Sequence, residues 1–191
     1  MMGSQLGLKT PGKEIAGEMM MRGETSNTYS GVTLDLSSCA LVELTIQAPG
    51  GGGGGSVVIR NTSVQIVDFY EGDGASGGAI ETFEVNLEPG DSITLPTGGT
   101  AGSSTGGTLG DGINRQAGSG TKRPDMSFKG TTIASGNQGA GAFRRYSAPP
   151  YESNYNRNAS GNGGDGGYLS GSTIIGAKNG GAANITWELK D

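Results

Sequence analysis

The residues in this chain that could perform chemistry are mainly carboxylates. Asp68, Glu71 and Asp73 lie close together in the sequence, and Glu81 and Glu84 form a second group. Two carboxylic acids are sufficient for glycoside hydrolysis, so these acids admit a polysaccharide depolymerase. In VDFYEGDG, however, the acids also suit turns and strand edges, and no aromatic-lined acidic groove is evident in the sequence. We therefore expect no enzymatic activity and keep the depolymerase as a disfavoured alternative.

Two short motifs match nucleophile patterns but lack the groups that would activate them. Ser76 lies in GASGG, which fits G-x-S-x-G, yet the chain has no histidine to act as the base. Ser119 and Lys122 fit S-x-x-K without any companion motif. With no histidine and a single cysteine, Cys39, we expect no catalytic residues, no metal site and no cofactor.

Six consecutive glycines, Gly50–Gly55, follow the stretch VELTIQAP. A strand that leads into glycines is half of a dinucleotide-binding pattern, and the other half is a helix whose N-terminus faces the pyrophosphate. The residues that follow, SVVIR, are rich in β-branched side chains and predict a strand instead. We therefore exclude a nucleotide site and expect a packed glycine layer, in which side chains would prevent backbones from approaching closely.

The composition is typical of a β protein with a thin core. Glycine accounts for 39 of the 191 residues, while Leu, Ile, Val and Phe together number only 33. The net charge of −5 is modest for a disordered chain of this length. Residues 1–97 carry a balance of −8 and residues 98–191 a balance of +3. No nucleic-acid partner is expected, and the N-terminus lacks the apolar region of a signal peptide.

Apolar residues that alternate with polar ones predict antiparallel strands in two parts of the chain. The predicted strands cover residues 32–36, 41–48, 56–60, 64–70, 83–87, 92–95 and 184–189. The sequence thus predicts a mainly β fold, a small antiparallel β-sandwich with a glycine-rich region and an extended N-terminal arm. We divide the chain into an arm or docking segment at 1–31, a β part at 32–97, a glycine-rich part at 98–182 and a C-terminal strand at 183–191. This last strand should return to the β part, because Trp187 contributes to folding only if it is buried.

The glycine-rich part contains 22 glycines in 85 residues. Several recur at a three-residue step, as in Gly136 and Gly139 or in Gly161, Gly164 and Gly167. Extended helices of the polyproline-II type have three residues per turn, so glycine at every third position lets them pack closely. The pattern indicates polyglycine-II-like helices, and a flexible Gly/Ser linker is the alternative.

One stretch without glycine, residues 143–158, interrupts this part of the chain. Tyr, Arg and Asn are typical of recognition loops, because they combine rigid contact area with adaptable hydrogen bonding. Its net charge of +2 suits a partner that carries phosphates or acidic sugars. We expect either a receptor contact or a subunit contact. The candidate residues are Phe143, Arg144, Arg145, Tyr146, Tyr151, Asn154, Tyr155 and Arg157.

The order of these pieces resembles the glycine-rich domain of bacteriophage tail-fibre and tail-tip adhesin proteins. The resemblance covers roughly residues 40–189 and rests on VELTIQAPGGGGGG, VNLEPGDSITLPTGGTAG and TTIASGNQGAGA, followed by a glycine-rich tail that ends in a strand. It implies a sandwich of polyglycine-II helices that presents variable loops to the bacterial surface. The chain departs from the family in its lower glycine density and in the insert at 143–158. The family has no shared catalytic residues to transfer to this chain.

The resemblance implies a non-enzymatic structural protein of a phage virion, a tail-fibre or tail-tip subunit that binds the host receptor. A capsid decoration or knob protein, anchored by the arm 1–31, is the structural alternative. The expected partners are other virion proteins, further copies of the chain in a homotrimer or ring, and a bacterial surface glycan or outer-membrane receptor. Oligomerisation is expected because so few apolar residues bury little surface. The expected location is the virion.

Overall fold

The computed structural model describes residues 26–27, 32–35, 41–86, 91–146 and 155–189. These residues are mainly β, include no helix and form several small sheets, which confirms the mainly β part of the predicted fold class. Of the predicted arm at 1–31, only Ser26–Asn27 lies among the described residues, where it forms the short strand β1. The rest of the arm lies outside them.

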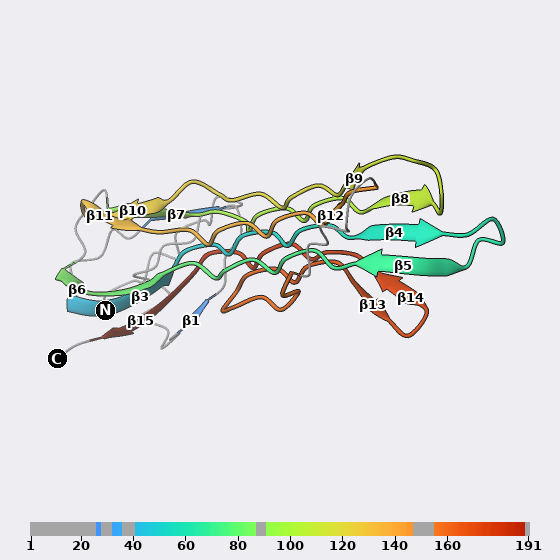
Figure 1. Cartoon of the computed structure of the whole chain (residues 1–191). Helices are drawn as coiled ribbons and strands as arrows, with labels where there is room; N and C mark the ends of the chain where they lie inside the picture. The colour runs from blue at the N-terminus through green and yellow to red at the C-terminus, as the bar shows by residue number, and fades with distance from the viewer. Residues whose placement is uncertain (1–25, 28–31, 36–40, 87–90, 147–154, 190–191) are drawn as a thin grey trace, which may run out of the picture.

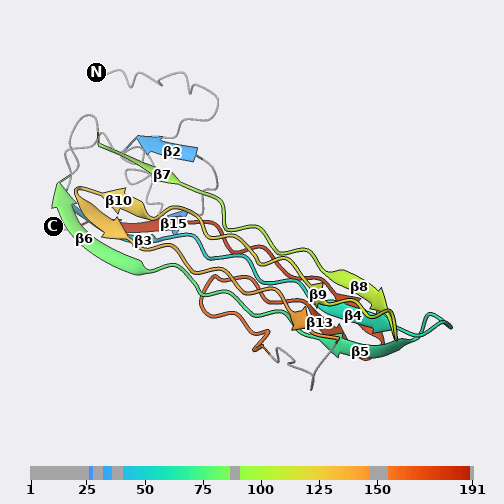
Figure 2. The same cartoon turned by 45° about the horizontal axis from the view of Figure 1, so that its top comes forward.

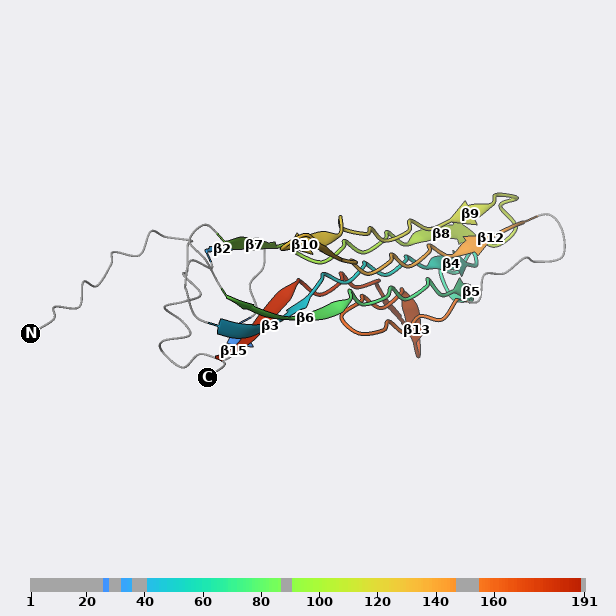
Figure 3. The same cartoon turned by 90° about the vertical axis from the view of Figure 1, so that its left-hand side faces the viewer.

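The molecule is elongated, with strands at its two ends and extended chain without strands between them (Figures 1 and 2). Figure 3 shows the same separation from another side. The sheet end contains β1, β2 (Val32–Asp35), β3 (Leu41–Gln47), β6 (Ile80–Asn86), β7 (Ser92–Leu95), β10 (Met126–Phe128), β11 (Thr131–Ile133) and β15 (Asn184–Leu189). The hairpin end contains β4 (Val57–Arg60), β5 (Ile66–Tyr70), β8 (Thr105–Thr108), β9 (Arg115–Gln116), β12 (Phe143–Arg144), β13 (Tyr168–Ser170) and β14 (Thr173–Ile175).

A four-stranded sheet in the order β1-β15-β3-β6 dominates the sheet end. The C-terminal strand β15 pairs antiparallel with β3, so that Ile185 lies opposite Ile46. The inner face packs a core to which β7, β10 and β11 also contribute, and Phe83 meets Phe128 edge-on at 5.2 Å. The side chain of Trp187 lies outside the described part of the structure.

Gly50–Gly55 run through the middle of the molecule, and their amides donate hydrogen bonds with a period of three. Gly50 and Gly53 donate to the carbonyls of Gly181 and Lys178, which lie on one neighbouring segment. Gly51 and Gly54 donate to a second segment through Ser76 and Asp73, and Gly52 and Gly55 to a third through Thr121 and Gly118. From one residue to the next, the direction of the N–H group therefore rotates about the axis of the segment by about a third of a turn, as in an extended helix with three residues per turn.

The carbonyls of the same glycines bind three other segments. The carbonyls of Gly50 and Gly53 accept hydrogen bonds from the amides of Gly99 and Gly102. The remaining carbonyls accept from the amides of two further segments, again with a period of three residues. Six segments thus surround the central one, in the order 72–79, 134–142, 117–121, 97–105, 178–183 and 162–167. Their directions alternate, and each is also hydrogen-bonded to the next around the ring. All twelve backbone polar groups of Gly50–Gly55 are therefore satisfied without a ladder of strands.

Glycine is required in the central segment because the neighbouring backbones leave no room for a side chain. A Cβ added at any of Gly50–Gly55 would overlap a backbone carbonyl group of an adjacent segment. The opposite holds for Gly176, where an added Cβ would have no neighbour within 4 Å. The loss of chain entropy on ordering glycine is therefore offset by hydrogen bonds that only a chain without side chains could make here.

At the hairpin end, β4 pairs antiparallel with β5 and parallel with β8. One face of this sheet is buried, and Val57, Ile59 and Tyr70 form a small core there with Ala117 and Ala142. The other face carries Arg60. The strands β8 to β14, within the predicted glycine-rich part, were not expected from the sequence, because each has only two to four residues.

Candidate functional site

The hairpin end gathers arginine side chains from segments far apart in the sequence. They are Arg60, Arg115, Arg144, Arg145 and Arg157, and the carboxylates among them are Asp68, Glu71 and Asp111. Arginine presents a planar fork of donors that binds carboxylate and phosphate groups through two parallel hydrogen bonds. This end of the molecule is therefore the part best equipped to bind an anionic partner.

Two of these arginines lie directly opposite each other in the strand pair β12–β9, because Arg144 is in register with Arg115. Like charges in this position repel each other, and a separate carboxylate faces each guanidinium. Arg115 donates to Asp111 at 2.6 Å, while Arg144 lies 3.9 Å from Asp68, which also accepts a 2.6 Å hydrogen bond from Tyr70. The repulsion between the strands is thus balanced locally.

The same arrangement changes the acidity of Asp111. The hydrogen bond from Arg115 and, after it, the amide of Ile113 lower the pKa of Asp111 to about 2. Arg115 Nε and Arg144 Nη1 are nevertheless buried without a hydrogen-bond partner among the described residues. Buried donors without partners are rare and cost about 1–3 kcal/mol each. This arginine pair therefore does not maximise stability.

The remaining two arginines of the predicted insert are held against aromatic rings. The guanidinium of Arg157 lies 4.2 Å from the ring centre of Tyr168, and its Nη1 atom lies 3.6 Å from Glu71. Arg145 lies 5.7 Å from the ring centre of Phe143. Both distances are within the range of cation–π attraction. The contacts of Arg157 fasten the insert to β13 and to the segment that follows β5, whereas the contact between Arg145 and Phe143 lies within the insert.

The structure brings the described residues of the insert to one end but gives them different surroundings. Phe143 and Arg144 form β12, and the side chain of Arg144 is only 11% exposed. Tyr146 is 44% exposed, whereas Tyr155 and Arg157 are half-buried. The predicted contact residues Tyr151 and Asn154 lie outside the described residues. Arg144 and Arg157 therefore serve in part to build the hairpin end.

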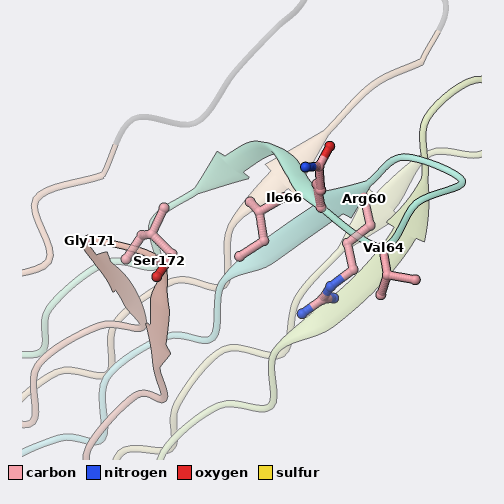
Figure 4. A pocket seen from close by; sticks show the side chains of 7 residues that line it. Arg60, Val64, Ile66, Gly171 and Ser172 are labelled. Atoms are coloured by element: carbon pink, nitrogen blue, oxygen red, sulfur yellow. The ribbon is translucent and has the colours of Figure 1, made fainter.

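Arg60, the last residue of β4, was not among the site residues expected from the sequence. Its guanidinium has no ion pair, hydrogen bond or ring partner within the described ranges, unlike the other arginines of this end. It lines a groove of about 640 Å³ between the β4–β5 and β13–β14 hairpins (Figure 4). The other lining residues are Val64, Gln65, Ile66, Leu169, Gly171 and Ser172.

The acids considered for depolymerase chemistry do not form one site. Asp68 and Glu71 lie at the hairpin end beside arginines, whereas Glu81 and Glu84 lie on β6 at the sheet end (Figure 1). Burial raises the pKa of Asp73 within the central bundle. Within the described residues, no group of three or more acids, cysteines or histidines is placed to hold a metal ion.

The described residues also include no helix long and apolar enough to span a membrane. Comparisons with known proteins give no match, since no family model and no curated protein matches the chain. The function must therefore be argued from the geometry of the two ends and of the bundle that joins them.

Proposed function

We propose that this chain is a non-enzymatic structural protein of a bacteriophage virion, a tail-fibre or tail-tip subunit whose hairpin end contacts the host receptor. The observation that carries the proposal is the gathering of five arginines, with exposed aromatic and aliphatic side chains, at one end of an elongated molecule. Cationic and aromatic side chains are typical anchors of recognition surfaces. The resemblance of the sequence to phage tail adhesins supports the same assignment.

The central bundle has the role of a rigid spacer in this proposal. We assign the segments of this bundle to polyglycine-II helices. The bundle and the sheet end together would form a sandwich, with strands at both of its ends. The three-residue period of the hydrogen bonds and the close approach at Gly50–Gly55 support this assignment. A bundle whose backbone groups bind one another can hold loops in place without a large apolar core.

The sheet end would attach the subunit to the rest of the virion. It carries the exposed carboxylates of Glu81 and Glu84, so its charge is opposite to that of the hairpin end. A homotrimer or ring is the expected assembly, because the apolar cores at both ends are small. Sedimentation should show an oligomer at micromolar concentration, and a compact monomer that melts cooperatively would contradict this part of the proposal.

The test is competition for the host surface. Purified full-length protein should bind susceptible cells and block adsorption of the phage particle in which mass spectrometry detects the chain. If the protein occurs in particles but neither binds cells nor blocks adsorption, a capsid decoration protein becomes the better assignment. Release of polysaccharide fragments by the protein would show instead that it is a depolymerase.

A further inference from the structure

We propose that the groove between the β4–β5 and β13–β14 hairpins binds an acidic peptide segment, with Arg60 as the contact for its carboxylate. This inference rests on the proposed function and names the partner of one part of the hairpin end: an exposed loop of a surface protein. It assigns this role to Arg60, which lies outside the predicted insert.

Arg60 carries a charge that no described residue neutralises. Arg60 is half-buried and lines the groove, and its guanidinium has no partner within the described part of the chain. On β8, Thr108 is in register with Arg60 and Gly106 with Val58, and a Cβ added at Gly106 would be 3.9 Å from Arg60 Nη1. The absence of a side chain at Gly106 leaves space beside the guanidinium. A partly desolvated guanidinium of this kind binds most strongly to a carboxylate that accepts two hydrogen bonds from it.

Val64, which lines the same groove as Arg60, has a strained backbone conformation. Val64 has φ = 65° and is 72% exposed, although β-branched residues rarely adopt positive φ. Asn61 fixes this conformation, because its Oδ1 accepts hydrogen bonds from the amides of Ser63 and Gln65 and its carbonyl accepts from Val64. Strain that the surrounding structure maintains is commonly found at binding sites. The tip is thus held in place with an apolar side chain displayed toward solvent.

The composition of the groove selects the class of partner. Its apolar walls are aliphatic, formed by Val64, Ile66 and Leu169, and the described lining residues include no aromatic ring. A glycan site would be expected to offer aromatic rings on which sugars stack. Aliphatic walls with one arginine, beside the polar side chains of Gln65 and Ser172, instead fit a peptide that carries an acidic residue next to a Leu-like side chain. The volume of about 640 Å³ is within the range of such sites.

Figure 4 shows how these residues share one opening. Arg60 and Val64 lie at the tip of the β4–β5 hairpin, Ile66 lies on β5, and Gly171 and Ser172 form the turn of the facing hairpin. Tyr168, at the start of that hairpin, is held by Arg157. Both walls of the groove are therefore positioned by contacts inside the hairpin end, and a ligand would meet a site that is already formed.

The first experiment measures binding to the full-length protein by NMR, with the peptides Ac-Leu-Glu-Leu-NH2 and Ac-Leu-Gln-Leu-NH2 as probes. The Glu peptide should shift the amide signals of Ile66 and Ser172 and bind about tenfold or more tightly than the Gln peptide. Arg60→Gln should remove this difference. Lys122→Gln, which changes the net charge equally but lies away from the groove, should leave the difference intact.

Equal binding of the two peptides, or unchanged selectivity in Arg60→Gln, would overturn the proposal. Tighter binding of glucosamine 1-phosphate than of the Glu peptide would also overturn it and identify a phosphorylated glycan as the ligand. Ser172→Phe provides an independent check, because a ring in the mouth of the groove should block the peptide while Arg60 remains.

A second experiment uses cells and separates the inference from the proposed function. Protease treatment of susceptible cells should abolish binding of the wild-type protein, periodate treatment should not, and Arg60→Gln should bind untreated cells at least about tenfold more weakly. If Arg60→Gln binds cells as well as wild type does, the groove proposal fails while the receptor-binding role stands. If no variant binds cells, the proposed function fails, and the NMR result still decides the chemistry of the groove.

Discussion

Arg144 lies directly opposite Arg115 in the antiparallel pair β12–β9, and each guanidinium faces a different carboxylate. Two cations in register are tolerated because Asp111 and Asp68 approach them from separate segments. The hairpin end therefore depends on charge pairing as much as on its small apolar core. This dependence makes its stability sensitive to acid.

Replacing Asp111 by Asn should make the protein less sensitive to pH. The pKa of Asp111 falls from its usual 3.8 to about 2 in the folded state. The unfolded chain therefore takes up this proton at a higher pH than the folded chain does. The stabilisation is fully present above about pH 4 and is lost as the pH falls toward 2.

The measurement is the melting temperature of wild type and Asp111→Asn between pH 6 and pH 2. The wild type should lose more stability than the variant as the pH falls from about 4 to 2. Identical slopes in this window would show that the Arg115–Asp111 contact does not contribute as described.

Replacing a central glycine by alanine should disrupt the bundle. In Gly53→Ala the new methyl group would overlap the backbone of Asp165, so a neighbouring segment must move and lose hydrogen bonds. Because backbone rather than a flexible side chain must yield, we expect a loss of about 3 kcal/mol or more in the free energy of unfolding. Gly176→Ala is the control and should change it by less than about 0.5 kcal/mol, since the added methyl group has open space. Denaturant unfolding of both variants decides the matter, and equal stabilities would refute the packing described for Gly50–Gly55.

The side chain of Asn162 joins three segments of the bundle. Its Oδ1 accepts from the amide of Gly78 at 2.8 Å, and its Nδ2 donates to the carbonyls of Ala48 and Ala182. Asn162→Ala should leave these groups without partners and destabilise the protein by about 2–3 kcal/mol. Asn158→Ala, at an exposed position, should cost less than about 0.5 kcal/mol. Similar losses in the two variants would show that the bridge at Asn162 adds nothing specific.

The insert at 143–158 can be tested for receptor contact against subunit contact. The double variant Arg145→Ala with Tyr151→Ala should give normal particles that adsorb poorly, with a loss of roughly thirtyfold in affinity if a central anchor is removed. Particles that fail to assemble would identify a subunit contact. Unchanged assembly and adsorption would show that these two side chains contact neither partner.

The sequence predicted the mainly β class because alternation is strong in LVELTIQ and NITWEL, which pair in the structure as β3 and β15. It could not predict which segments surround Gly50–Gly55, since a three-residue glycine step specifies a helix type and not its neighbours. The hairpin β13–β14 was missed because its strands have three residues each. Short strands of this kind carry too few residues for a periodic pattern to emerge.

Arg60 shows why the candidate site was only partly predictable. A single arginine before Asn61 carries no motif, and its importance depends on where the carboxylates lie after folding. In the strand pair β4–β5, Asp68 is in register with Ile59 and shares its face of the sheet. Asp68 therefore meets Arg144 on that face, whereas Arg60 lies on the opposite face. The insert, by contrast, was predicted as a contact site from its composition, because Tyr, Arg and Asn stand out in a glycine-rich background.

Electron cryomicroscopy of the intact phage particle that carries this chain tests the central claim most directly. We predict density for the elongated molecule at the tip of the tail or tail fibre, with the sheet end joined to the virion and Arg60 and Tyr146 facing outward. Density on the capsid shell, or a hairpin end buried against another virion protein, would contradict the proposed receptor-binding role.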